Sequence, residues 1–154
     1  LFAKNKKSQE VLKKNLSSFR FEYHCLVASA PKQKNDKINL WLKYGSKNRI
    51  FLEKPNTEGA VLSSTQYVTL ESFEAYTHLL VHPITYYPSQ IRFHFSNIGN
   101  PIVGDNHFGV RQKSENWLKL YCTSIQFQHP ATGKHLKVET SLPNTFMKVN
   151  LPIF

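Results

Sequence analysis

The stretch from Pro88 to Gly109 constrains this chain most, because it contains both the start and the end of one short helix. Ser89 is a candidate N-cap and Gly99 a candidate C′ residue, since these residue types favour those positions. Between them, apolar residues recur at the spacing of one helix face: Ile91, Phe95 and Ile98. The sequence therefore predicts an amphipathic helix of about ten residues.

Arg92 is the unusual residue of this helix, because it lies in or near the first turn. The positive end of the helix dipole disfavours a cation there unless an anion lies close by. A carboxylate or a phosphate would provide that anion, whereas a solvated surface arginine is the simpler interpretation. Spacing alone leaves these interpretations open.

Runs of β-prone residues predict the rest of the fold. The two longest runs, Ala60 to Leu70 and Tyr76 to Ile84, are expected to pair antiparallel, and the second leads directly into the helix. Further strands are expected at Phe21 to Val27, Ile38 to Leu42, Arg49 to Leu52, Trp117 to Phe127 and Lys134 to Thr140. The other expected elements are a helix from Lys6 to Phe19 with Ser8 as N-cap, a polar loop from Val110 to Asn116 and a short helix from Leu142 to Val149. This order predicts an α+β domain and is compatible with more than one fold of that class.

Basic residues are concentrated in the first third of the chain. Residues 1–54 contain thirteen Lys and Arg against four Asp and Glu, whereas the remaining residues contain seven against six. This asymmetry fits a polyanionic partner whose phosphates are bound without sequence specificity, but solvated lysines explain it equally well. Lys13 and Lys14 face away from the apolar side of the first expected helix and are candidates for phosphate contacts.

Several classes of protein lack support in the sequence. No apolar run is long enough to span a membrane, and no signal-peptide pattern is present. Cys25 and Cys122 lie in apolar runs without disulfide spacing, which indicates a reducing compartment, the cytoplasm. The seven histidines show no metal-binding spacing, and no nucleophile-elbow, phosphate-loop or dinucleotide motif occurs, so neither metal nor cofactor is expected. Asp105 is a possible catalytic acid, but a turn carboxylate that caps backbone amides is the favoured interpretation.

A series of motifs resembles the RluA-type RNA pseudouridine synthase family, in the family's order. The central match is Gln90-Ile91-Arg92, followed by Ile98 to Asp105 (IGNPIVGD) and Phe108-Gly109, which is similar to the family pattern QIR, short helix, IGxPIxGDxxYG. The remaining matches are Phe2-Ala3-Lys4-Asn5, Tyr23 with Leu26-Val27, Ser64-Thr65-Gln66-Tyr67, Phe127 to Gly133, and Leu142 to Phe146. The resemblance covers essentially the whole chain.

The resemblance implies a single catalytic domain over residues 1–154, with a mostly antiparallel mixed sheet and flanking helices. It implies isomerisation of uridine to pseudouridine in structured ribosomal or transfer RNA, by a monomer that needs no cofactor. In that reaction the base is extruded, an aspartate attacks the nucleotide, and the base rotates and rejoins through carbon. The expected site residues are Tyr23 and Arg92 for catalysis, and Leu120, Gln90, Lys13 and Lys14 for substrate binding.

Four departures from the family pattern accompany this resemblance. The chain lacks the H-R-L-D motif that carries the nucleophilic aspartate and that would lie a few residues upstream of Leu1. Because the chain also begins without methionine, we expect an N-terminally truncated domain that is inactive alone. Phe21, Tyr87 and Ser89 replace a lysine, an arginine and a histidine of the family pattern, which indicates a divergent branch. The alternative function is a catalytically silent RNA-binding domain of the same fold.

Overall fold

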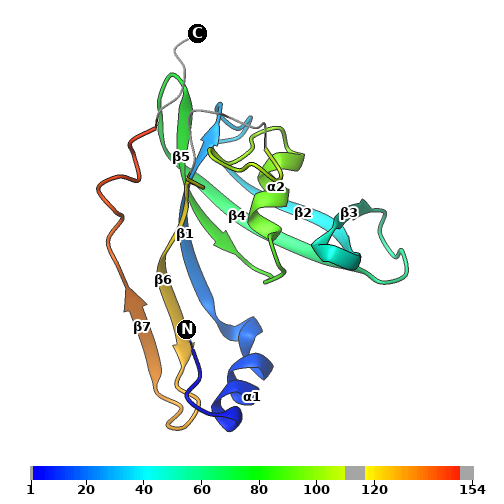
Figure 1. The fold of residues 1–154 in the computed structure, drawn as a ribbon, viewed down its shortest axis with the longest axis vertical. Helices are drawn as coiled ribbons and strands as arrows, with labels where there is room; N and C mark the ends of the chain where they lie inside the picture. Colours follow the sequence, from blue (N-terminus) through cyan, green and yellow to red (C-terminus); the bar gives the residue numbers. More distant parts are fainter. Residues whose placement is uncertain (1, 110–116, 150–154) are drawn as a thin grey trace.

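The computed structural model describes residues 2–109 and 117–149, which form a seven-stranded sheet and two α-helices (Figure 1). The sheet has the order β3-β2-β4-β5-β1-β6-β7. Its strands are β1 (Arg20–Ala28), β2 (Asn35–Tyr44), β3 (Ile50–Glu53), β4 (Ala60–Ser72), β5 (Tyr76–Pro83), β6 (Leu120–Gln128) and β7 (His135–Glu139). The helices are α1 (Lys6–Lys14) and α2 (Gln90–Asn97), with short 3-10 turns η1 (Leu16–Ser18) and η2 (Ser46–Asn48).

The predicted α+β class is confirmed, and every pair of neighbouring strands in this sheet is antiparallel. The two longest predicted runs pair as β4 and β5, and the shorter strands β2 and β3 pair as a hairpin. The chain order does not predict that β1 lies between β5 and β6. This placement sets Tyr23 opposite Val81 on one side and Cys122 on the other, so the first strand runs through the middle of the sheet.

Helix α2 covers one face of the sheet, and the main core lies beneath it (Figure 1). Ile91 and Phe95 of the helix pack with Cys25, Leu79 and Val81 of the strands, and all five are buried. Burial of one such large side chain contributes about 1.5–3 kcal/mol, so this contact is the main attachment of α2 to the sheet. The third residue of the predicted stripe, Ile98, is instead 37% exposed because the helix ends just before it.

The two ends of α2 differ in how well the sequence predicts them. Gly99 has φ +82° and donates its N–H to the Ser96 carbonyl, while Asn100 N–H donates to the Phe95 carbonyl. These two bonds form a Schellman motif and confirm Gly99 as the C′ residue. Ser89 occupies the N-cap position, but it has φ +56° and its side chain makes no capping hydrogen bond.

Helix α1 is shorter than predicted and starts from a different cap. Asn5, rather than Ser8, is the N-cap, and its side chain accepts a hydrogen bond from Ser8 N–H at 2.8 Å. The helix ends at Lys14, and the chain continues as η1 instead of remaining helical to Phe19. None of its side chains is buried, so little tertiary packing supports a longer helix.

The predicted helix from Leu142 to Val149 is wrong, because this segment forms turns. The Lys119 ammonium group donates to the carbonyl oxygens of Thr145 and Lys148 at 3.2 and 2.6 Å. Phe146 is buried in a second apolar cluster with Leu26 and Val103. These contacts outweigh local helix propensity in a short segment. The predicted polar loop from Val110 to Asn116 lies outside the described residues.

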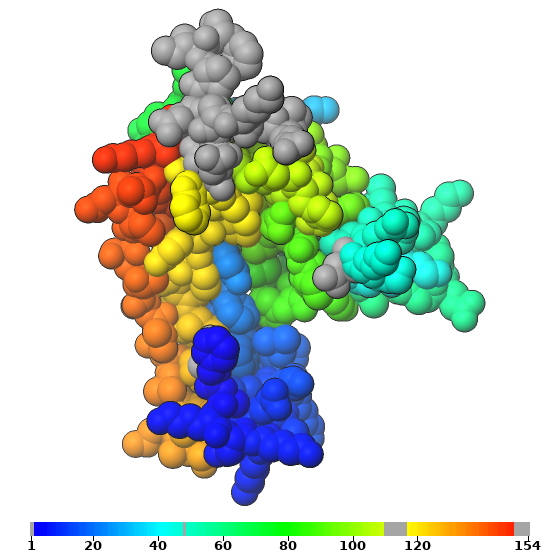
Figure 2. Space-filling model, viewed as in Figure 1, coloured from blue at the N-terminus to red at the C-terminus, as the bar shows by residue number. Residues whose placement is uncertain are grey.

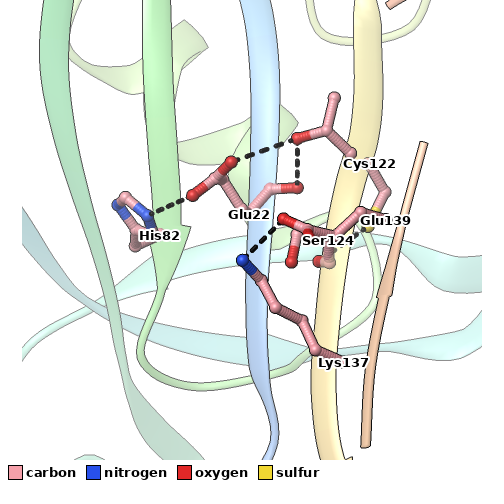
Figure 3. A network of polar contacts seen from close by, with 7 residues as sticks. Glu22, His82, Cys122, Ser124, Lys137 and Glu139 are labelled. Carbon is pink, nitrogen blue, oxygen red and sulfur yellow. Dashed lines mark hydrogen bonds and ion pairs between the residues drawn. The ribbon is translucent and has the colours of Figure 1, made fainter. Parts of the chain in front are cut away.

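A network of polar side chains extends across β1, β5, β6 and β7 (Figure 3). The Glu22 Oε2 atom lies 3.4 Å from His82 Nε2, and the Lys137 Nζ atom forms an ion pair with Glu139 Oε1 at 2.6 Å. All four side chains are at least 40% exposed, so these pairs contribute little to stability. In the described part of the chain, no helix has the length and apolarity needed to cross a membrane.

Candidate active site

A cavity of about 430 Å³ lies where β1, the β5–α2 connection, the start of α2 and the first residue of β6 meet. Its lining is mostly aromatic and apolar: Phe21, Tyr23, Pro83, Thr85, Tyr86, Tyr87, Pro88, Ser89, Gln90, Ile91, Arg92 and Leu120. The volume lies in the range of small-molecule sites, and a few polar groups interrupt the apolar walls. The cavity is therefore the leading candidate for an active site.

Four of the six predicted site residues line this cavity: Tyr23, Gln90, Arg92 and Leu120. Sheet order explains the meeting of Tyr23 and Leu120, because the register pairs Cys25 with Leu120 across β1 and β6. The two predicted lysines lie elsewhere. Lys13 borders a second hollow of about 500 Å³ between α1 and the sheet, and Lys14 is exposed on α1 without lining either space.

Arg92 lies in the cavity wall and is held by a carboxylate from outside the lining. Its Nε and Nη2 atoms donate to the two carboxylate oxygens of Asp105 at 2.8 and 2.7 Å. The guanidinium carbon also lies 5.0 Å from the ring centre of Phe108, within cation–π range. Arg92 is the third residue of α2, so Asp105 provides the anion that a cation near a helix start requires. The structure thus excludes the solvated arginine.

Asp105 pairs with Arg92 and also caps backbone N–H groups of its own turn. It accepts the backbone N–H groups of His107 and Phe108, both at 3.0 Å, which confirms the expected turn carboxylate. Burial alone would raise the pKa of its carboxyl, but the Arg92 guanidinium and these two N–H groups hold that pKa below its usual value. The side chain is 1% exposed and both oxygens are engaged, so this carboxylate is a structural anion and a poor nucleophile.

The Arg92 guanidinium keeps part of its hydrogen-bonding capacity. Within the described residues, Nη1 has no hydrogen-bond partner, and the side chain is 26% exposed while lining the cavity. Its bond to Asp105 raises the pKa of Arg92, so the group remains cationic at any relevant pH. Asp105 occupies the Nε and Nη2 atoms of the guanidinium, so the Nη1 edge can still bind an anion inside the cavity.

Tyr23 contributes a neutral aromatic wall. Burial raises the pKa of its phenol to about 12, with smaller contributions from Cys122 and Tyr86. The phenol therefore stays protonated at neutral pH, which makes it a weak general base and a suitable stacking partner or hydrogen-bond donor. Leu120 also lines the cavity and packs against the main core, so it adds an apolar surface to the lining.

Gln90 lines the cavity, but its amide is fully engaged in the protein. The oxygen accepts from Thr85 Oγ1 at 2.7 Å and Tyr87 N–H at 3.3 Å. The amide nitrogen donates to the Ser64 carbonyl at 3.0 Å and Thr65 Oγ1 at 2.9 Å. These bonds tie the start of α2 to β4, so the geometry favours a role in shaping the wall over direct substrate contact.

Sequence reasoning did not assign three aromatic residues that line the cavity: Phe21, Tyr86 and Tyr87. Phe21 and Tyr87 are departures from the family pattern, and Tyr86 has no assigned role in it. The Tyr86 ring packs edge-on against Phe21 at 4.8 Å, and its hydroxyl donates to the Phe19 carbonyl at 2.6 Å. The two consecutive tyrosines directly before the predicted helix were the signal available in the sequence. In the described ranges, no group of three His, Cys, Asp or Glu side chains is arranged to hold a metal ion.

The fold is similar to two solved human structures. Human RNA Pseudouridylate Synthase Domain Containing 1 gives a TM-score of 0.76 at 21% identity, over 94% of this chain and 63% of that chain. Human RNA Pseudouridylate Synthase Domain Containing 4 gives 0.68 at 17% identity, over 90% and 62%. At these identities the similarity establishes the fold alone, which is that of a pseudouridylate synthase domain.

A family model described as RNA pseudouridylate synthase matches residues 1–97. The chain therefore belongs to the RNA pseudouridylate synthase family, and the resemblance to its RluA-type members is confirmed. Ribosomal large subunit pseudouridine synthase C of Yersinia pestis is 29% identical over 132 residues, or 81% of this chain and 38% of that protein. Ribosomal large subunit pseudouridine synthase D of Pseudomonas aeruginosa is 35% identical over 97 residues, or 54% and 30%. The chain thus spans between 30% and 38% of the length of these relatives.

Proposed function

We propose that this chain forms the base-binding pocket of an RNA pseudouridine synthase that isomerises uridine in structured ribosomal or transfer RNA. The cavity carries the proposal, because it combines the neutral Tyr23 ring with the guanidinium of Arg92. An extruded base needs an aromatic or apolar surface to replace the stacking that it loses in the RNA. Tyr23 and Leu120 provide that surface.

Arg92 would keep the nucleophilic carboxylate ionised. A carboxylate that enters this mostly apolar cavity loses water, which raises its pKa and favours the neutral acid. The free Nη1 edge of Arg92 opposes this effect by pairing with the charged form. The ionised carboxylate then attacks the nucleotide, the glycosidic bond breaks, and the base rotates before it rejoins through carbon.

The nucleophile itself is not among the aspartates of this chain. The sequence contains two, Asp36 and Asp105, and neither lines the cavity. Asp105 uses both oxygens to hold Arg92 and the adjacent turn. We therefore place the nucleophile in a segment that precedes Leu1, as the resemblance to the H-R-L-D motif implies, and we expect the 154-residue chain alone to be inactive.

A catalytically silent RNA-binding domain is the second candidate function. It is favoured by one observation: among the described residues that line the cavity, none has an acidic side chain. The basic α1 and the aromatic cavity would then bind RNA without chemistry. In both cases the partner is RNA, and we propose a cytoplasmic monomer that acts without metal or cofactor. The two free cysteines fit a reducing compartment.

Tritium release from RNA that carries 5-tritiated uridine separates the two functions. The full-length protein should release tritium from ribosomal or transfer RNA, and replacement of the upstream aspartate by asparagine should abolish that release. RNA binding without tritium release by the full-length protein would favour the silent domain. Release by the 154-residue chain alone would contradict our placement of the nucleophile.

A further inference from the structure

Two tyrosine rings beside the cavity have no role in the hydrophobic core. Tyr44 is the last residue of β2, and Tyr87 belongs to the connection between β5 and α2. Their ring centres lie 5.9 Å apart, with the planes tilted by 36°. Neither ring belongs to the apolar cluster under α2 or to the one around Phe146. Core packing therefore does not explain this aromatic pair.

Hydrogen bonds hold the Tyr44 side chain and the Tyr87 backbone, and the two rings contact each other, although both residues remain partly exposed. The Tyr44 hydroxyl donates to the Pro88 carbonyl at 3.2 Å, and Tyr87 N–H donates to the Gln90 side chain at 3.3 Å. Rings that are already oriented lose little conformational entropy when a ligand stacks on them. The pair is a preorganised aromatic surface at the edge of the cavity, since Tyr87 and Pro88 also line it.

The β2–β3 hairpin adds positive charge beside this surface. Lys47 and Arg49 follow Tyr44 in the hairpin connection, and both are exposed. Neither forms an ion pair with any described residue, and the next acidic residue in the sequence is Glu53. Figure 2 shows the hairpin projecting sideways from the body of the molecule, with an open notch between it and α1. Aromatic rings next to free cations are typical of surfaces that bind single-stranded nucleic acid.

We propose that Tyr44 and Tyr87 form a stacking subsite for an unpaired base adjacent to the uridine in the cavity. Lys47 and Arg49 contact the phosphates on the same side. This inference rests on the proposed function, because it assumes that the cavity holds a nucleotide of an RNA strand. It adds a substrate requirement: the neighbouring base must be unpaired, whereas stacking tolerates any base identity.

Binding of a short, fluorescently labelled oligouridylate to the full-length protein tests the subsite without any need for turnover. Tyr44→Leu is the informative variant, because Tyr44 does not line the cavity and leucine preserves an apolar side chain. Loss of one stacked base costs about 1–3 kcal/mol, so affinity should fall about 5- to 150-fold. Tyr44→Phe keeps the ring and should bind more tightly than Tyr44→Leu.

Tyr76→Leu is the matched control. Tyr76 also donates its hydroxyl to a backbone carbonyl at 3.2 Å and packs beside an aromatic ring, but it lies by the second apolar cluster, away from the cavity. Its replacement should leave oligouridylate affinity unchanged, and thermal melting should show that each variant is folded. Tyr44→Leu should also keep the salt dependence of binding, since stacking releases no counterions, whereas Lys47→Ala with Arg49→Ala should reduce it.

Equal oligouridylate affinity for Tyr44→Leu and the unchanged protein would overturn the subsite, as would equal losses for Tyr44→Leu and Tyr76→Leu. Duplex RNA of the same length, whose bases are unavailable for stacking, should bind the Tyr44→Leu variant and the unchanged protein equally. A protein that binds oligouridylate as predicted but never releases tritium would retain the subsite and lose the proposed function, so the two failures are distinguishable.

Discussion

Asp105→Asn is the sharpest test of how the cavity is built, because it removes one charge and changes almost no volume. The carboxylate is 1% exposed and accepts four hydrogen bonds, two of them from Arg92. Asparagine keeps one oxygen, which can still accept from the two backbone N–H groups. Its NH₂ group, however, then faces the Arg92 Nε–H donor that lay 2.8 Å from the lost oxygen.

The size of the loss follows from the burial of the pair. Removal of one partner from a fully buried ion pair costs about 3–5 kcal/mol, because the remaining charge has no compensation. The Arg92 side chain is 26% exposed and regains some hydration, so we expect a smaller loss of about 2–4 kcal/mol in the free energy of unfolding. Urea unfolding followed by circular dichroism measures this loss, and an unchanged denaturant slope would show that both states keep their compactness.

Glu139→Gln is the matched control for Asp105→Asn. It removes one carboxylate from the Lys137–Glu139 pair, which is as short, at 2.6 Å, but has side chains 52% and 58% exposed. Its free energy of unfolding should stay close to that of the unchanged protein, because water replaces the lost partner. Equal losses for the two variants would refute the argument from burial. A second refutation would be additive losses for Asp105→Asn and Arg92→Met in the double variant, since contacting residues should couple.

The remaining predictions concern the site, the partner and the core. Arg92→Met in the full-length protein should nearly abolish turnover and weaken RNA binding less than about tenfold, whereas Lys13→Ala should weaken binding and retain turnover at saturating RNA; equal profiles would contradict the role of Arg92. RNA affinity should fall steeply as salt rises, and a flat response would exclude phosphate contacts. Burial lowers the pKa of the His94 imidazole to about 4, so the unfolded chain binds a proton at this residue more tightly than the folded chain does. The free energy of unfolding should therefore fall by up to about 3 kcal/mol as the pH drops from about 6.5 to 4. The fall should be less steep in the His94→Gln variant. Gly104→Ala should lower the melting temperature, because φ is +77° and the new methyl group would meet the Trp117 carbonyl.

Local patterns predicted the elements that depend on local interactions. The run from Tyr76 to Ile84 became β5, and Gly99 closed α2, because strand propensity and a left-handed C′ residue act within a few residues. Predictions failed where distant contacts decide the outcome. The segment from Leu142 to Val149 has the composition of a short helix, but Lys119 binds two of its carbonyl groups and the sheet buries Phe146.

In the candidate site, too, local features were predictable from the sequence and long-range contacts were not. The sequence indicated that Arg92 requires an anion, but its identity as Asp105 depends on the turn after Gly99, which folds the chain back over thirteen residues. Tyr23 and Leu120 were assigned only through the family resemblance, because the order β5-β1-β6 that joins them is a long-range property of the sheet. The lysines of α1 were assigned from charge alone, and the structure places them outside the cavity.

The exposed basic residues and the cavity depend on different parts of the fold. Gln90 and the buried Phe95 lock α2 to the sheet, so the position of Arg92 depends on the core. Ten of the 20 lysines and arginines instead lie on α1, the β1–β2 connection and the β2–β3 hairpin, and neither α1 nor β3 buries any side chain. Substitutions in α1 or the hairpin connection can therefore change RNA affinity without moving the cavity. Under the proposed function, substitutions around Arg92 should change both the free energy of unfolding and turnover. RNA affinity should accordingly vary through the exposed basic elements, while the pocket that α2 and β1 hold stays the same.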